Sequence, residues 1–129
     1  MNTFRRRAAC AVFLFLAATG LGTACLSPTL PLPPPGEPES IQPADTEGEW
    51  VVSGTCVPGA LVTVFNQETG RGAVVEDIDN SGRYSLVIDG TRCDAAWIAQ
   101  ETGEDASPHT VFVLQETTGS LPEDNGACQ

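Results

Sequence analysis

The feature that most constrains the fold is the alternation of apolar and polar residues in short runs between residues 48 and 116. Val62 and Val64 flank Thr63, for example, and the same period of two recurs along the chain. A period of two places successive side chains on opposite faces of an extended strand. The pattern predicts strands within residues 50–52, 60–65, 73–75, 84–88, 95–100 and 110–115.

Turn-forming residues separate these runs. They lie at residues 58–59, 68–70, 80–82, 89–90 and 102–108, and most of these segments contain glycine or proline. No stretch has helical periodicity with capping residues. Because each alternating strand must bury one face against a second sheet, we expect an all-β fold: a small antiparallel sandwich of six or seven strands. Residues 48–116 form one domain near the lower size limit for an independent core.

The first 24 residues predict a signal peptide. A basic start containing Arg5, Arg6 and Arg7 precedes an apolar run over residues 8–21, and small residues lead to Cys25. The segment Leu21-Gly22-Thr23-Ala24-Cys25 resembles the bacterial lipobox. The resemblance implies that Cys25 carries a lipid that anchors the protein at the outer membrane or cell surface. Ordinary cleavage after Ala24, with release of a soluble protein, is the alternative.

Proline dominates the chain after Cys25. Seven prolines lie between residues 28 and 43, together with serine, glutamate and glycine. This composition favours extended polyproline II structure and cannot bury a core. Residues 25–47 are therefore predicted to be a disordered tether. Its proline-rich part, residues 26–43, could hold the domain some 50 to 60 Å from the membrane if fully extended at about 3.1 Å per residue.

The charge balance restricts the partners. The chain carries 6 Arg and no Lys against 17 Asp and Glu, a net charge of −11. Removal of the signal takes three arginines and leaves 3 − 17 = −14. Such a protein cannot neutralise a phosphate backbone and is repelled by anionic lipid head groups. Nucleic acid is excluded as a partner, whereas a cationic partner or divalent cations are electrostatically allowed.

Two motifs carry a family resemblance. The run Val52-x-Gly54-x-x-x-Pro58-Gly59-Ala60-x-Val62-x-Val64, followed by Asp79-x-Ser81-Gly82-x-Tyr84-x-Leu86, is similar to bacterial immunoglobulin-like and carboxypeptidase regulatory-like domains. The resemblance covers about half the chain. It implies an immunoglobulin-like sandwich that serves as a stalk, spacer, adhesion or accessory module, and it implies no catalytic activity. Residues 117–129 are then a polar, glycine-containing tail, expected to be loosely ordered unless Cys128 holds it.

Three cysteines remain for a disulfide after Cys10 and Cys25 are set aside. In an oxidising compartment one pair is expected, and sequence spacing alone leaves all three pairings open. The immunoglobulin-like resemblance implies that Cys56 and Cys93 lie in connections at the same end of the sandwich. A Cys56–Cys93 disulfide follows as a hypothesis, with Cys128 as the competing partner.

Few residues suggest a binding or catalytic site. Asp77 and Asp79, followed by Gly82, resemble the start of a calcium loop, but Ile88 stands where a closing carboxylate is needed, and the same residues suffice as a turn. Asp105, Ser107 and His109 have the residue types of a catalytic triad, at a spacing that rarely gives its geometry. Trp50 and Trp97 are expected to pack in the core or to cover an edge of the sandwich, whereas exposure on a sheet face would favour sugar binding.

Together these patterns predict a cell-envelope lipoprotein that acts as a non-catalytic structural or protein-interaction module. Its expected partners are the membrane, through the lipid, and an envelope or extracellular protein. No cofactor, no catalytic residue and no firm metal site is expected. The alternative is a small extracellular protein that binds glycan or calcium.

Overall fold

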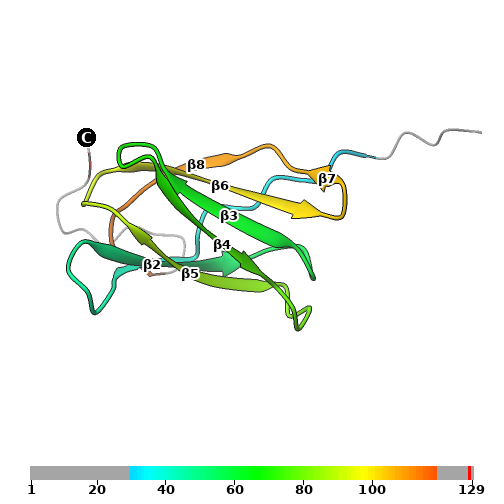
Figure 1. Ribbon diagram of the computed structural model, residues 1–129, viewed down its shortest axis with the longest axis horizontal. Coiled ribbons are helices and arrows are strands. Elements are labelled where there is room, and N and C mark those ends of the chain that lie inside the picture. The colour runs from blue at the N-terminus through cyan, green and yellow to red at the C-terminus, as the bar shows by residue number, and fades with distance from the viewer. Residues whose placement is uncertain (1–29, 119–127, 129) are drawn as a thin grey trace, which may run out of the picture. The chain divides into compact units, whose positions relative to one another are not determined.

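The computed structural model describes residues 30–118 and residue 128, and its folded unit begins at Pro31. Figure 1 shows two layers of strands, with β2 and β5 in one layer and β3, β6 and β8 in the other. The strands are β1 (Ser40–Pro43), β2 (Glu49–Thr55), β3 (Leu61–Asn66), β4 (Arg71–Glu76), β5 (Arg83–Asp89), β6 (Ala95–Thr102), β7 (Asp105–Ala106), β8 (Thr110–Val113) and β9 (Thr117–Thr118). The described residues include no helix long and apolar enough to cross a membrane.

The predicted antiparallel sandwich is confirmed. One sheet has the order β5-β2-β1-β9, and the other has the order β4-β3-β6, with β7 and β8 both paired to β6. The second strand thus pairs with the fifth and the third with the sixth in opposite layers, which is the immunoglobulin-like arrangement. The six expected runs became β2, β3, β4, β5, β6 and β8, and the short strands β1, β7 and β9 were not expected.

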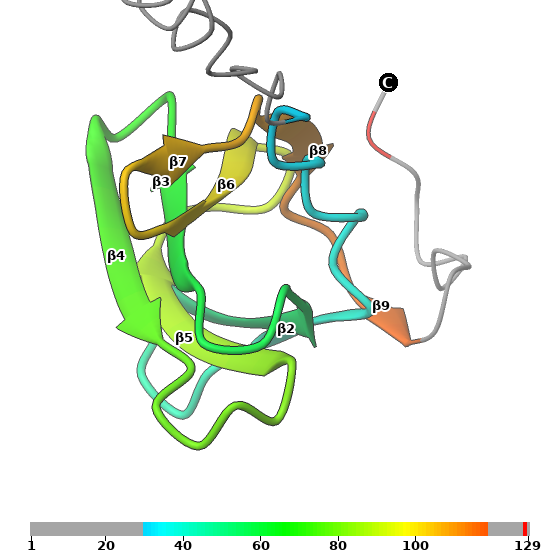
Figure 2. The ribbon, with the colours of Figure 1, turned by 90° about the vertical axis from the view of Figure 1, so that its right-hand side faces the viewer.

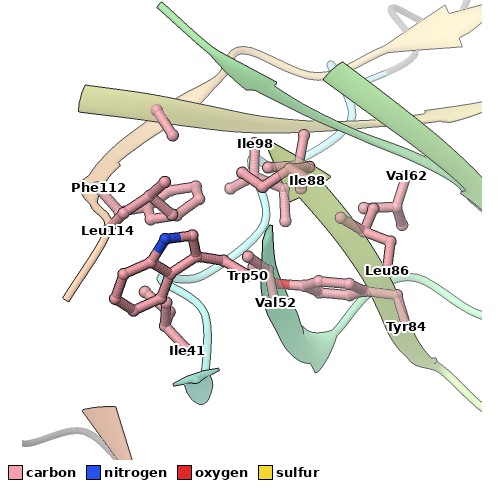
Figure 3. Close-up of a cluster of buried hydrophobic side chains, with 12 residues drawn as sticks. Ile41, Trp50, Val52, Val62, Tyr84, Leu86, Ile88, Ile98, Phe112 and Leu114 are labelled. Atoms are coloured by element: carbon pink, nitrogen blue, oxygen red, sulfur yellow. The ribbon is translucent and has the colours of Figure 1, made fainter. Parts of the chain in front are cut away.

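The core lies between the two sheets (Figure 3). It consists of Ile41, Trp50, Val52, Val62, Val64, Tyr84, Leu86, Ile88, Ala96, Ile98, Phe112 and Leu114. Fully burying such a side chain contributes roughly 1.5 to 3 kcal/mol. One glycine of the recognised motif makes room in this core, because a Cβ at Gly54 would lie 2.8 Å from the hydroxyl oxygen of Tyr84.

The expected tether over residues 25–47 is wrong in its C-terminal part. Pro35 and Pro38 are buried, and Ile41 lies in the core as part of β1. Figure 2 shows this segment, in cyan, passing along the side of the sandwich between β8 and β9. Proline cannot donate a backbone hydrogen bond, but its ring is apolar and its carbonyl still accepts. The composition was therefore compatible with packing against a fold built by other residues.

Two side chains hold the proline segment to the β6–β8 edge. The side-chain amide of Gln100 donates to the Pro33 carbonyl at 2.8 Å, and the hydroxyl of Thr110 donates to the Pro35 carbonyl at 2.6 Å. The part of the expected tether that precedes residue 30 lies outside the described residues, as do the signal peptide and Cys25. Only the segment from Pro31 onwards is thus reassigned from tether to folded domain.

The hypothesis of a Cys56–Cys93 disulfide is also wrong. Cys56 directly follows β2, Cys93 lies after β5, and these seven-residue strands are antiparallel neighbours. The two cysteines therefore lie at opposite ends of the strand pair, roughly 20 Å apart at about 3.3 Å per residue. A disulfide needs Cα atoms within about 7 Å, so this pair cannot form.

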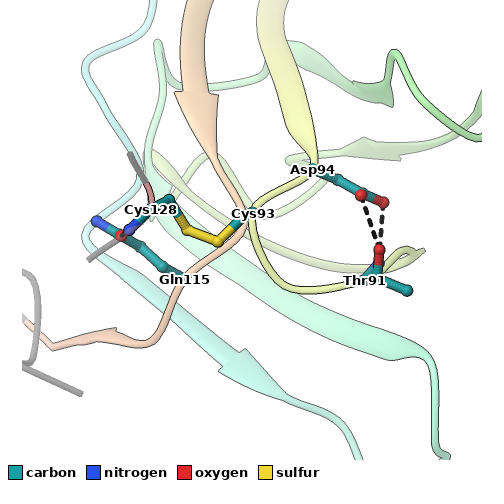
Figure 4. Close-up of a disulfide and its surroundings, with 5 residues drawn as sticks. All are labelled: Thr91, Cys93, Asp94, Gln115 and Cys128. Atoms are coloured by element: carbon teal, nitrogen blue, oxygen red, sulfur yellow. Dashed lines mark hydrogen bonds between the residues drawn. A yellow bond between two sulfur atoms is a disulfide. The ribbon is translucent and has the colours of Figure 1, made fainter. Parts of the chain in front are cut away.

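The disulfide joins Cys93 to Cys128 instead, with Cα atoms 5.3 Å apart (Figure 4). The Cys128 amide also donates to the side chain of Gln115. At the other end of the chain's tail, β9 pairs with β1. The C-terminal tail, expected to be loosely ordered unless Cys128 holds it, is thus attached at residues 117–118 and at Cys128; residues 119–127 lie outside the described residues.

Candidate functional site

The carboxylate of Asp77, the calcium candidate, accepts hydrogen bonds from the protein's own amide and hydroxyl groups. Its Oδ2 accepts the Gly59 and Gly82 amides at 3.0 and 2.8 Å, and its Oδ1 accepts the amide and hydroxyl of Ser81. The Gly59 amide contributes most to holding the pKa of Asp77 well below its usual range. Asp79 accepts the Ser81 amide at 3.3 Å, and a hydrogen bond between the Asp79 and Asp77 side chains also helps to lower the pKa of Asp77. Asp77 thus ties the β4–β5 connection to the β2–β3 connection, and this role explains its motif without a cation.

A second cluster of polar groups, around the carboxylate of Asp94, was not predicted from the sequence. The fully buried Asn66 donates to the side chain of Asp94 at 2.9 Å and to the Asp89 carbonyl, and Asp94 also accepts the amide and hydroxyl of Thr91. Burial acts to raise the pKa of Asp94, but the hydrogen bonds from Asn66 and Thr91 outweigh it and lower the pKa. The sequence signal for this cluster was Asn66, a polar residue at an inward-facing position of the alternating strand β3.

Neither cluster makes a metal centre. No group of three or more His, Cys, Asp or Glu residues within the described parts of the chain could hold a metal ion. The carboxylates that do converge with other polar groups accept hydrogen bonds from amides and hydroxyls of the turns. Their chemistry is that of loop stabilisation, in which a carboxylate replaces water at backbone donors.

Asp105, Ser107 and His109, which have the residue types of a catalytic triad, each contact different partners. The Ser107 hydroxyl donates to the Pro108 carbonyl at 2.7 Å and accepts a hydrogen bond from the backbone N–H of Gln100 at 3.0 Å. Asp105 pairs with Thr102 in the β6–β7 hairpin. The His109 ring packs against Trp97, with ring centroids 5.7 Å apart. The Ser107 hydroxyl therefore links β6 to the short segment between β7 and β8 at the edge of the sheet.

The free thiol of Cys56 is half-buried next to the core. Burial raises its pKa, and the negative charge of Asp77 raises it further. A thiol with a raised pKa is mostly protonated at neutral pH and is a poor nucleophile. Cys56 therefore lacks the electrostatic environment of a reactive cysteine.

A hollow of about 340 Å³ lies near the β1–β2 turn, and the residues that line it include Glu47, Glu49, Trp50, Gly90 and Arg92. Trp50 is buried, as expected, and its indole N–H donates to the Gly90 carbonyl at 3.1 Å. The polar atom of the largest side chain in the hollow is thus already satisfied. The tryptophan serves the core rather than presenting its ring to a ligand.

Trp97 behaves differently from Trp50, because it lies half-buried on the outer side of the second sheet. It stacks on Phe65 with ring centroids 5.3 Å apart, and His109 contacts it as well. Phe65 also covers Gly72, where a Cβ would lie 3.1 Å from its ring. The neighbouring rings limit how much of the Trp97 face a sugar could stack on.

The outer face of this sheet, called here the apolar face, collects most of the exposed apolar side chains of the sandwich. Cross-strand register gives three rows: Glu76, Leu61 and Glu101; Val74, Thr63 and Ala99; and Gly72, Phe65, Trp97 and Val111. The pair Ala95 and Val113 continues it. Val74 is 57% exposed and Val111 54%, whereas Leu61 and Val113 lie near 36% and 37%. The apolar face is the strongest candidate site in the described structure.

The register also gives the apolar face an acidic end. Glu76 and Glu101 lie on either side of Leu61, both exposed and both on the outer side of the sheet. Two of the arginines form ion pairs elsewhere, Arg71 with Asp89 and Arg83 with Glu39, at 3.0 Å each. The strand positions that form the apolar face therefore combine carboxylates with aliphatic and aromatic groups.

Comparison of the chain with protein-family models, with curated proteins and with solved structures found no match.

Proposed function

We propose that this protein is a cell-envelope lipoprotein whose immunoglobulin-like sandwich acts as a non-catalytic protein-interaction module. The observation that carries the proposal is the apolar face over β4, β3, β6 and β8. The largest apolar patch on a soluble monomer, typically about 300–600 Å², is often functional. Here Val74, Leu61, Val111 and Val113 share one side of one sheet.

The N-terminal pattern supports attachment to a membrane. If Cys25 carries a lipid, residues 26 to 30 alone connect it to the folded unit that begins at Pro31. Five residues reach at most about 18 Å when fully extended, at about 3.5 Å per residue. The domain would then remain close to the membrane surface, in place of the 50 to 60 Å reach that a fully extended tether would give.

Intact mass of the mature protein, purified from its native membrane, tests the anchor. We expect a diacylglycerol-modified Cys25 at the N-terminus and, after thiol alkylation without reduction, one added group, on Cys56. Reduction should expose two further thiols, from Cys93 and Cys128. An unmodified N-terminus at Cys25 would contradict the lipoprotein proposal and indicate a freely secreted domain.

The size of the protein in mild detergent tests the interaction role. Protein solubilised from its own envelope should elute as a complex larger than the monomer. The double variant Val74→Asp/Val111→Asp should elute as a monomer, because two charges would be buried in the interface. Val87→Asp is the matched control, since Val87 is 46% exposed on the outer side of the other sheet. The role of the apolar face would be refuted if the wild-type protein eluted as a monomer. It would also be refuted if Val87→Asp dissociated the complex and the double variant did not.

A further inference from the structure

We infer that the partner of the apolar face is a different protein, with an apolar centre and Lys or Arg residues that meet the Glu76–Leu61–Glu101 row. The inference rests on the proposed function and names the chemistry of the surface that would bind. Its basis is the arrangement of the rows: carboxylates end the face on one side, and aromatic and aliphatic groups fill the rest. A complementary surface must therefore be asymmetric in charge.

The carboxylate pair is arranged to receive a cation. Leu61 stands directly opposite both Glu76 and Glu101, so the Cα atoms of the two glutamates lie two strand spacings apart, or about 10 Å. Among the described residues, neither side chain makes a hydrogen bond or an ion pair. A Lys or Arg placed over Leu61 would lie between them and could interact with both, while its aliphatic stem covers the leucine.

Charge disfavours the two competing occupants. After removal of the signal, a second copy would bring a chain of net charge 3 − 17 = −14 against another of the same charge, and long-range repulsion opposes that association. An anionic lipid surface is repelled for the same reason. A cationic protein surface is instead attracted, and electrostatic steering of this kind accelerates association and fixes orientation.

The area of the apolar face indicates how strongly the partner is expected to bind. Four strands about 4.8 Å apart, over the length of some six residues, give an area of roughly 300 Å². Stable complexes bury about 800 Å² on each partner, so the apolar face alone fits a transient complex or the centre of a larger one. In an interface of this size, charge complementarity is expected to decide a large share of the specificity.

The test is photocrosslinking in the native cell, with a benzophenone amino acid at position 111 or, as a control, at position 87 of the full-length protein. We expect position 111 to crosslink to a different protein, at an apolar segment flanked by Lys or Arg. Position 87 should not. Glu76→Lys/Glu101→Lys should lower the yield about tenfold, because like charges would then oppose each other. Glu47→Lys/Glu68→Lys adds the same charge at exposed turn positions and should leave the yield unchanged.

Other outcomes overturn the inference, and they separate it from the proposed function. A crosslink to a second copy or to lipid, or a yield that both double variants reduce equally, would refute the cationic protein partner while leaving the apolar face as an interaction surface. The absence of any crosslink at position 111, together with a monomeric wild-type protein in detergent, would refute both. Thermal melting of each variant shows whether the fold is retained, so that a lost crosslink reports on binding.

Discussion

The outer faces of the two sheets differ, although both belong to one sandwich with one shared core. The β5–β2–β1 sheet turns mostly polar groups outward, such as Ser53, Ser85 and Gln42, with Val51 and Val87 as an isolated apolar pair. The β4–β3–β6–β8 sheet turns outward the apolar face. A sandwich needs apolar groups only on its inner faces, so the second sheet carries more apolar surface than folding requires.

The largest expected effect is at the inner side of the apolar sheet. Ile98→Ala should lower the free energy of unfolding by about 4 kcal/mol, because Ile98 is fully buried and the substitution leaves a cavity. Urea denaturation of the isolated domain measures this change. A loss below about 1 kcal/mol would mean that the inner face of β6 is not packed as described, and the contrast between its inner and outer sides would fail.

An effect that depends on pH is expected where a loop joins the two sheets. The pKa of Asp77 is lowered in the folded state, so its carboxylate stabilises the fold above the unfolded-state pKa of about 3.9. This contribution is lost as the pH falls through the lower, folded-state pKa. Asp77→Asn should be less stable than the wild type at pH 7, and the two should approach each other in strong acid. Thermal melting at a series of pH values tests this, and a difference independent of pH would contradict it.

A smaller effect on stability is expected one residue before Ile98, on the outer side of the same strand. Trp97→Ala should lower the free energy of unfolding by only about 1 kcal/mol, since the half-buried ring loses its contacts with Phe65 and His109. It should nevertheless weaken partner binding in the detergent-solubilised complex. A loss of stability as large as that of Ile98→Ala would indicate that Trp97 serves the fold and would remove the distinction between the two sides of β6.

The sequence predicted much of the fold, because alternation in β3 and β5 directly reports which side chains face inward. It missed β1, where one apolar residue, Ile41, stands among prolines and polar residues. Sequence spacing left the three cysteine pairings open. The immunoglobulin-like resemblance led to the wrong pair, Cys56 and Cys93, because the antiparallel pairing of β2 with β5 places the two connections at opposite ends. The apolar face could not be predicted for a similar reason. Phe65 and Trp97 become neighbours only through the pairing of β3 with β6.

The most direct test of the difference between the two outer faces is their accessibility in the native envelope. Val111→Cys and Val87→Cys, each in a Cys56→Ser background, can be labelled with a membrane-impermeant maleimide, both in intact cells and after purification. We expect similar labelling rates for the purified variants, and a rate at position 111 that is at least several-fold lower than at position 87 in cells. Equal rates at the two positions in cells would contradict the claim that the apolar face is covered by a partner.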